Sequence, residues 1–290
     1  MKIQEAKDLL VDLYKKSLCV YNPSANIHPV RVVESSKSIV GIDPENPIKN
    51  ILSYCSKYVD EFQLSEKFCE DEKADIPLVV SYLDLELSLM HNNREKSFVN
   101  VFNLLKVSEG AQILEFLLEF SLKYCASAYF LIWSVYRMEL FLKFENIKES
   151  LILCVEYILN DDKVERSIVD VSIDDFLMKM NFNENTYKDL ISLYNMYNNK
   201  FIRKDKINPY ILSVIAEKYE SNKEFDEKMN ILKDQRKYGR KWVLLYLNGL
   251  ELNNINYNLI LNLDAARGAI KVLKNKKETD FIWNGLNKIL

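Results

Sequence analysis

The sequence predicts an all-α protein, built as an irregular multi-helix array or a bundle of antiparallel helices. Glycine and proline number only six each among 290 residues. Average proteins contain about 7% glycine and 5% proline, so the turn residues that an all-β fold requires are scarce here. Apolar residues recur at the 3.6-residue spacing of a helix along most of the chain. With 48% hydrophobic residues, the chain can bury a large core.

The first 75 residues predict two helices and one segment of a different kind. Helical spacing of apolar residues covers residues 3–18 and resumes over residues 47–59. Between these segments, residues 28–43 are rich in β-branched side chains and are flanked by Pro, Ser and Asp. This composition favours a short β-hairpin or an ordered loop. The acidic run at residues 70–75 predicts a solvated linker.

The segment from Leu83 to Leu89 alternates apolar and polar residues, as a half-buried strand does. On a helical wheel, however, the polar residues Ser81, Asp84 and Ser88 lie on one side. Leu and Glu also favour helix over strand. We therefore expect a helix here.

The segment from Tyr124 to Tyr136 contains no charged residue. A helix of this length spans about 20 Å, which is short of the roughly 30 Å of bilayer hydrocarbon. Lys123 and Arg137 close its two ends. The sequence therefore predicts no membrane span. It predicts one long helix, or two helices separated near Ser127, with Trp133 in the core of the protein.

The polar stretch at residues 160–172 follows a helical pattern at residues 151–159 and predicts a domain boundary. We expect an acidic helical domain over residues 1–162, carrying the loop or hairpin as an insertion. A basic-leaning helical domain is expected over residues 172–290. Its helices are predicted at residues 173–180, 184–198, 209–220, 222–236, 240–250 and 257–274, with a short one at the end.

Charge is distributed unevenly along the chain. The net charge is -3. Residues 1–199 contain 21 Lys and Arg against 31 Asp and Glu, whereas residues 200–290 contain 18 against 11. A basic C-terminal third favours an anionic partner there, although the two parts could also attract each other.

Cysteine usage predicts a reducing compartment. The five cysteines are widely spaced and contain no C-x-x-C pair, so neither a disulfide framework nor a zinc knuckle is indicated. The first residues include acids and lack an apolar run, so we expect no secretory signal. We expect a cytoplasmic protein. Its Lys, Asn, Ile and Tyr usage suggests an AT-rich bacterial genome, as a hypothesis from composition.

The sequence offers few residues for catalysis, and we predict no cofactor, no metal and no catalytic centre. Asp84, Ser88 and His91 share one helix face, but the acid and the imidazole would lie about 10 Å apart along the axis, too far for a catalytic relay. P-loop and Rossmann glycine patterns are absent from the sequence. Five acids could form a magnesium site, although helix ends are often acid-rich: Asp161, Asp162, Glu165, Asp174 and Asp175.

Residues 175–190 have the spacing of a helix-turn-helix, with Asn near the turn. Leu177 stands where a small residue usually lets the two helices touch, and Lys188 is the only cation of the second helix. A recognition helix needs cations that face the groove. DNA binding through this segment is therefore disfavoured.

A cluster near residue 240 combines cations with aromatic rings, which together can neutralise phosphates and stack on bases. A basic helix end that complements the helix dipole explains the same residues. The candidate binding residues are Arg236, Lys237, Tyr238, Arg240, Lys241 and Trp242.

Taken together, these features predict a non-catalytic cytoplasmic protein that acts by macromolecular interaction, as an adaptor, a regulator or an immunity or defence protein. We expect a protein partner and no membrane. One alternative is a nucleic-acid-binding regulator that uses the basic C-terminal third. Another is an enzyme with a carboxylate-based site in the helical core.

Overall fold

The protein is all-α, as the sequence predicts. The computed structural model describes residues 1–21, 27–65, 79–173, 184–218, 236–273 and 280–290. These residues form thirteen α-helices and two 3-10 helices, and they contain no β-strand. The α-helices are α1 (Ile3–Ser17), α2 (Pro29–Val40), α3 (Lys49–Asp60), α4 (Tyr82–Met90), α5 (Arg94–Val107), α6 (Gly110–Tyr124), α7 (Tyr129–Leu142), α8 (Ile147–Asn160), α10 (Glu184–Tyr197), α11 (Lys204–Lys218), α12 (Trp242–Asn248), α13 (Tyr257–Val272) and α14 (Asp280–Ile289); the 3-10 helices are η1 (Arg236–Lys241) and η2 (Leu252–Asn254).

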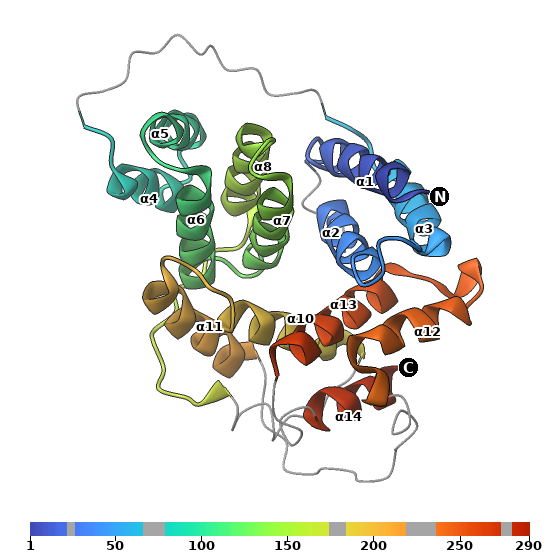
Figure 1. Cartoon of the computed structure of the whole chain (residues 1–290). Helices are drawn as coiled ribbons and strands as arrows, with labels where there is room; N and C mark the ends of the chain where they lie inside the picture. Colours follow the sequence, from blue (N-terminus) through green and yellow to red (C-terminus); the bar gives the residue numbers. More distant parts are fainter. Residues whose placement is uncertain (22–26, 66–78, 174–183, 219–235, 274–279) are drawn as a thin grey trace.

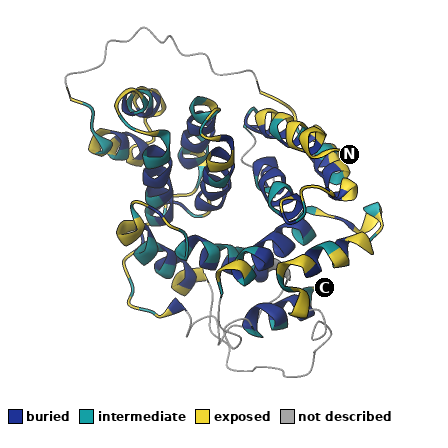
Figure 2. Ribbon diagram, in the orientation of Figure 1, coloured by how far each residue is buried: buried dark blue, intermediate teal, exposed yellow. Residues whose placement is uncertain are grey.

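The helices form three groups (Figure 1). Helices α1, α2 and α3 pack on one another, and α4 to α8 form a second group in which α6 contacts both α7 and α8. Helices α10 to α14 lie along one side of both groups. Within this third group, α10 packs against α11, α13 and α14. Figure 2 shows that α6, α7 and α13 are largely buried, whereas α1 and α12 expose their outer sides.

The uncharged segment after Lys123 belongs to the core. It is divided between α6 and α7, and the separation near Ser127 is the second of the two predicted arrangements. Asp161 stabilises the start of α7, because its Oδ2 accepts hydrogen bonds from the backbone N–H groups of Ser127 and Ala128 at 2.8 and 2.7 Å. Trp133 is only 6% exposed, as predicted. None of the helices in the described ranges combines the length and the apolar run that a bilayer crossing requires.

The predicted hairpin at residues 28–43 is wrong, because this segment forms helix α2. His28 caps the helix: its Nδ1 accepts a hydrogen bond from the N–H of Val30 at 3.2 Å, and Pro29 occupies the first turn. Helix α2 lies between α1, α3, α7 and α13 and buries residues on most of its surface. A helix that is enclosed in this way can contain β-branched residues, since packing outweighs their modest preference for strands.

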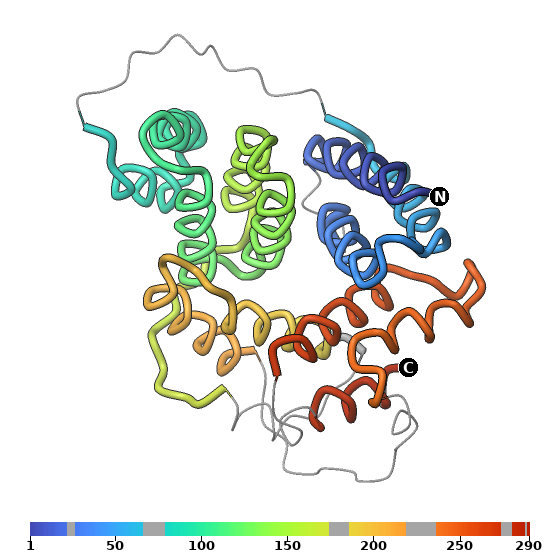
Figure 3. Tube along the Cα trace, in the orientation of Figure 1, coloured from blue at the N-terminus to red at the C-terminus, as the bar shows by residue number. Residues whose placement is uncertain are grey.

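Helix α13 brings the C-terminal part of the chain against the N-terminal part. It packs on α10 and on α2, and Figure 3 shows the red C-terminal tube beside the blue N-terminal one. After α8, residues 162–166 pair with Lys123 to Ala126 through backbone hydrogen bonds of 2.9 to 3.1 Å. The domain boundary at residues 160–172 stays a prediction.

Candidate functional site

The predicted basic cluster lies on η1, at the start of α12. Lys237, Tyr238, Arg240 and Lys241 are exposed. Gly239 between them has φ +53° and ψ -137°, a conformation that residues with a Cβ rarely adopt. The turn therefore holds the cluster at the surface in one backbone geometry.

Two of the six predicted residues are engaged inside the protein instead. Arg236 forms an ion pair with Asp280 of α14, and its guanidinium lies 6.0 Å from the centre of the Trp283 ring. Trp242 is fully buried, and its ring centre lies 5.4 Å from that of Trp283. These contacts join η1 and α12 to α14, so the surface available to a partner is formed by the other four residues.

A surface that the sequence analysis did not identify lies on α4. Leu83, Leu87 and Met90, at helical spacing i, i+4 and i+7, are 60%, 48% and 41% exposed. We call these three residues the α4 stripe; Figure 2 shows the outer side of α4 as exposed. Leu85 and Leu89 of the same helix are fully buried. Helix α4 is thus apolar on two opposite faces, and only one of them packs against other residues that the structure describes.

Polar contacts hold α4 in place with the α4 stripe outward. Ser81 caps the helix by accepting a hydrogen bond from the N–H of Leu83 at 3.0 Å. On the inner side, Asn100 of α5 donates to the carbonyl of Asp84 at 3.0 Å and to Ser88 Oγ at 3.3 Å. The outward direction of the α4 stripe is therefore fixed by these contacts and by the burial of the opposite face.

Helix α4 itself is acidic. It carries Asp84 and Glu86 and contains no Lys or Arg. Glu86, beside the α4 stripe on the helix, accepts a hydrogen bond from Tyr124 at 3.3 Å and lies 3.7 Å from Lys123 Nζ. An apolar row within acidic sequence favours a ligand that is both apolar and basic.

The polar residues that were weighed for catalysis and set aside have separate structural roles. Ser88 Oγ donates to the carbonyl of Leu85 at 2.9 Å, and the ring of His91 contacts the carbonyl of Leu87 through Nδ1 at 2.7 Å. Asp161 caps α7, as described above. Among the described residues, no group of three or more His, Cys, Asp and Glu side chains could hold a metal ion. Asp174, Asp175 and most of the helix-turn-helix segment at residues 175–190 lie outside the described residues.

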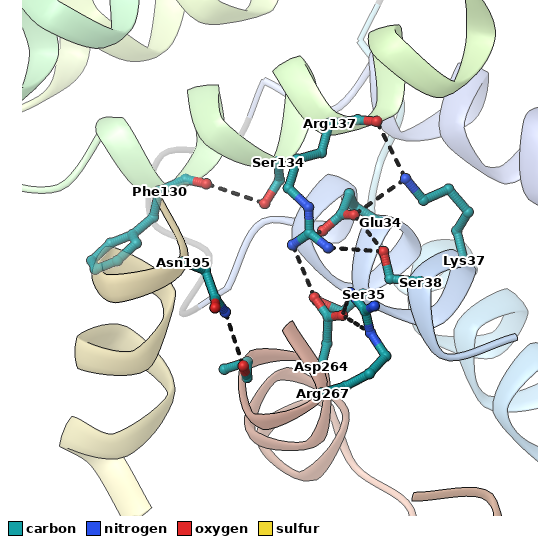
Figure 4. Close-up of polar contacts among 11 residues, drawn as sticks. Glu34, Ser35, Lys37, Ser38, Phe130, Ser134, Arg137, Asn195, Asp264 and Arg267 are labelled. Carbon is teal, nitrogen blue, oxygen red and sulfur yellow. Dashed lines mark hydrogen bonds and ion pairs between the residues drawn. The ribbon is translucent and has the colours of Figure 1, made fainter. Parts of the chain in front are cut away.

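Five charged side chains meet where α2, α7 and α13 come together (Figure 4). Arg137 of α7 is central: its Nη1 lies 3.0 Å from Asp264 Oδ2 and 2.9 Å from Glu34 Oε2. Lys37 Nζ lies 3.3 Å from Glu34 Oε1, and Arg267 Nη2 lies 2.7 Å from Asp264 Oδ1. We call Glu34, Lys37, Arg137, Asp264 and Arg267 the charge network.

Electrostatics within the charge network favour its ionised form. Burial acts to raise the pKa of Asp264, but the guanidinium groups of Arg137 and Arg267 outweigh it and hold that pKa below its usual value. Burial lowers the pKa of Lys37, an effect that Glu34 opposes. Each carboxylate faces at least two cationic or hydroxyl donors. Because the paired side chains come from α2, α7 and α13, the charge network joins these three helices.

A second buried acid, Glu139, joins α7 to α1 and α8. Its Oε1 accepts hydrogen bonds from Tyr14 at 2.9 Å and Ser150 at 2.7 Å. Burial raises the pKa of Glu139, while the hydroxyl donors of Ser150 and Tyr14 act to lower it. The sequence analysis missed Glu34, Glu139 and Asp264, because each of them resembles an ordinary surface acid of a helix.

Comparison of the chain with protein families, curated proteins and solved structures finds no match.

Proposed function

We propose that this protein is a non-catalytic helical protein that acts in the cytoplasm by binding another protein, as an adaptor, a regulator or a defence protein. The α4 stripe is the observation that carries the proposal. Contiguous exposed apolar side chains on an ordered helix are typical of interaction sites. The free thiols of Cys19, Cys55, Cys125 and Cys154 support a reducing compartment.

The partner segment that fits the α4 stripe is an amphipathic helix with a basic rim. Leu83, Leu87 and Met90 extend over two turns of α4, which is the length over which two crossing helices exchange side chains. The negative charge of Asp84 and Glu86 on α4 would steer Lys and Arg of the partner to the edges of the contact. The apolar face of the partner would cover the leucines.

The test uses a fluorescein-labelled amphipathic peptide made of Leu and Lys, with a scrambled peptide of the same composition as reference. Fluorescence anisotropy should show saturable binding of the amphipathic peptide only. The double variant Leu83→Ser and Leu87→Ser should weaken binding by about tenfold or more, since each substitution removes an apolar contact without changing the charge of the surface.

The matched control is Leu245→Ser on α12, another half-exposed leucine. It should bind the peptide as the unmodified protein does. Equal binding by the stripe variant and the control would contradict the proposal, and so would equal binding of the scrambled peptide. In the host cell, a photo-crosslinker at position 87 should capture a native partner, whereas a crosslinker at position 245 should not. The double variant of the α4 stripe should no longer bind that partner.

Nucleic-acid binding is a second candidate function, and the exposure of Lys237, Arg240 and Lys241 around Tyr238 favours it. Three cations beside an exposed ring can neutralise phosphates while the ring stacks on a base. Lys237 Nζ lies 5.1 Å from the centre of the Tyr238 ring, so the aromatic face and the charge are presented together. The salt dependence of binding separates this function from the first one.

A further inference from the structure

A small cavity lies where α12, η2, α13 and the end of α14 meet, and Figure 1 shows that these helices lie far from α4. Its volume is about 270 Å³, close to that of nine water molecules at about 30 Å³ each. This is just below the usual range for drug-sized ligands, so the cavity suits one small molecule. The lining residues are Tyr246, Leu250, Asn254, Asn256, Asn258, Leu259, Asn262, Ile289 and Leu290.

Asn262 is the most deeply placed polar group of the cavity. Its side chain is on α13, and the residue is only 4% exposed. The carboxamide oxygen, Oδ1, is buried and has no hydrogen-bond partner among the described residues. A buried acceptor without a donor is costly, because it has lost water and gained nothing in exchange. The missing partner is therefore expected to be a donor that enters the cavity.

The neighbouring asparagines offer further hydrogen bonds. Asn256 caps α13: its Oδ1 accepts the N–H of Leu259 at 2.9 Å. This contact fixes the carboxamide and leaves its Nδ2 as a donor for a ligand. The phenol of Tyr246 is protonated at neutral pH and can donate as well, and burial raises its pKa further. Donors and acceptors thus converge on one cavity.

The chemistry of the lining points to an uncharged ligand rich in hydroxyl groups. No lining side chain carries a charge, so nothing there compensates a phosphate or a carboxylate. A carboxamide both donates and accepts, which is what a hydroxyl group does. Leu250, Leu259 and Ile289 provide apolar surface for the carbon side of such a molecule.

We propose that this cavity binds a neutral polyhydroxylated small molecule of about monosaccharide size, with a ligand hydroxyl donating to Asn262 Oδ1. The site is separate from the α4 stripe, and it adds small-molecule recognition to a protein whose proposed function is protein binding.

The experiment is saturation-transfer NMR on the whole protein with glucose, mannose, N-acetylglucosamine, ribose and myo-inositol, followed by calorimetric titration of any compound that binds. At least one neutral compound should bind saturably. Glucose 6-phosphate and adenosine serve as charged and nucleoside references and should bind at least about tenfold more weakly. Absence of saturable binding by all the neutral compounds, or stronger binding of either reference, would overturn the proposal.

Variants locate the binding. Asn262→Leu has a similar shape but lacks the carbonyl, and it should abolish binding without lowering the melting temperature, because it removes an unpaired buried acceptor. A matched pair of variants, Asn254→Ala and Asn253→Ala, tests the rim of the cavity. Both residues are exposed, but only Asn254 lines the cavity. Asn254→Ala should weaken binding and Asn253→Ala should not. Unchanged binding in both Asn262→Leu and Asn254→Ala would place the ligand elsewhere and refute the site.

Discussion

Arg137 on α7 and Asp264 on α13 lie 127 residues apart in the sequence, and Arg137 Nη1 is 3.0 Å from Asp264 Oδ2. The same nitrogen lies 2.9 Å from Glu34 of α2. One guanidinium therefore joins helices from the N-terminal, middle and C-terminal parts of the chain. Removing it would leave two carboxylates in the interior with reduced compensation.

We predict that Arg137→Met lowers the free energy of unfolding by about 3–5 kcal/mol, because Glu34 and Asp264 lose their shared cation. The double variant Arg137→Met with Asp264→Leu should lose less than the sum of the two single variants, since the uncompensated acid is then also removed. Urea unfolding measures both. Lys16→Met is the control, because its ion pair with Asp60 is exposed and should be worth less than about 1 kcal/mol.

His28 should make stability depend on pH. Burial lowers the pKa of His28 from 6.5 to about 4. Between these values the unfolded chain binds a proton that the folded protein does not, so stability is complete above about pH 6.5 and falls as the pH is lowered towards 4. The total loss is about 3 kcal/mol, at about 1.4 kcal/mol for each pKa unit. Urea unfolding between pH 7 and pH 4 checks this dependence.

The chain contains a second histidine for comparison. His91→Asn should keep the pH dependence of stability. His28→Asn should lose the fall in stability between about pH 6.5 and 4, because Asn can cap α2 without titrating. Identical pH profiles for the two variants would show that another group is responsible.

Trp133→Ala should destabilise the protein by about 3–5 kcal/mol through lost burial and a cavity. The ring packs against Tyr136 and Phe201, with centres 6.0 and 5.6 Å away. Thermal or urea unfolding measures the change. Tyr238→Ala, at an exposed ring, should change stability by less than about 0.5 kcal/mol. A loss that small for Trp133 would contradict its position in the core.

Replacing Lys237, Arg240 and Lys241 by Ser should flatten the salt dependence of nucleic-acid binding by up to about three units, because each phosphate contact releases counterions. Arg236→Ser should instead lower stability slightly, as its ion pair with Asp280 is partly exposed. Filter binding at about 50 and 200 mM salt is the measurement. No binding at the lower concentration would remove nucleic acid as a candidate partner.

Sequence periodicity predicted many of the helices, but at α2 the β-branched composition was given more weight than the helical spacing. That helix is enclosed by its neighbours and buries polar residues such as Glu34, Ser35 and Ser36 together with its valines. His28 and Pro29 do form a recognisable helix start, but the β-branched residues that follow favoured a strand. Packing against neighbouring helices outweighed the local preference for a strand. A single segment of the sequence does not reveal such packing.

The candidate sites were predictable to different degrees. The cations of η1 are adjacent in the sequence, so their cluster could be found, but the burial of Trp242 depends on Trp283, which is remote. The α4 stripe was hidden because Leu83 to Leu89 contains apolar residues on both faces. The cavity at Asn262 needs the end of α14, so the asparagines alone could not predict it.

The charge network also constrains how the chain is made. Ser35 and Asp264 are hydrogen-bonded across 229 residues, and a ribosome adds about 5–20 residues each second. Ser35 must therefore wait many seconds before its partner on α13 is translated. During that interval the nascent N-terminal helices contain charges that they cannot bury at low cost. We expect α2 to reach its final packing only after α13 has left the ribosome, so the N-terminal helices complete their packing late in translation.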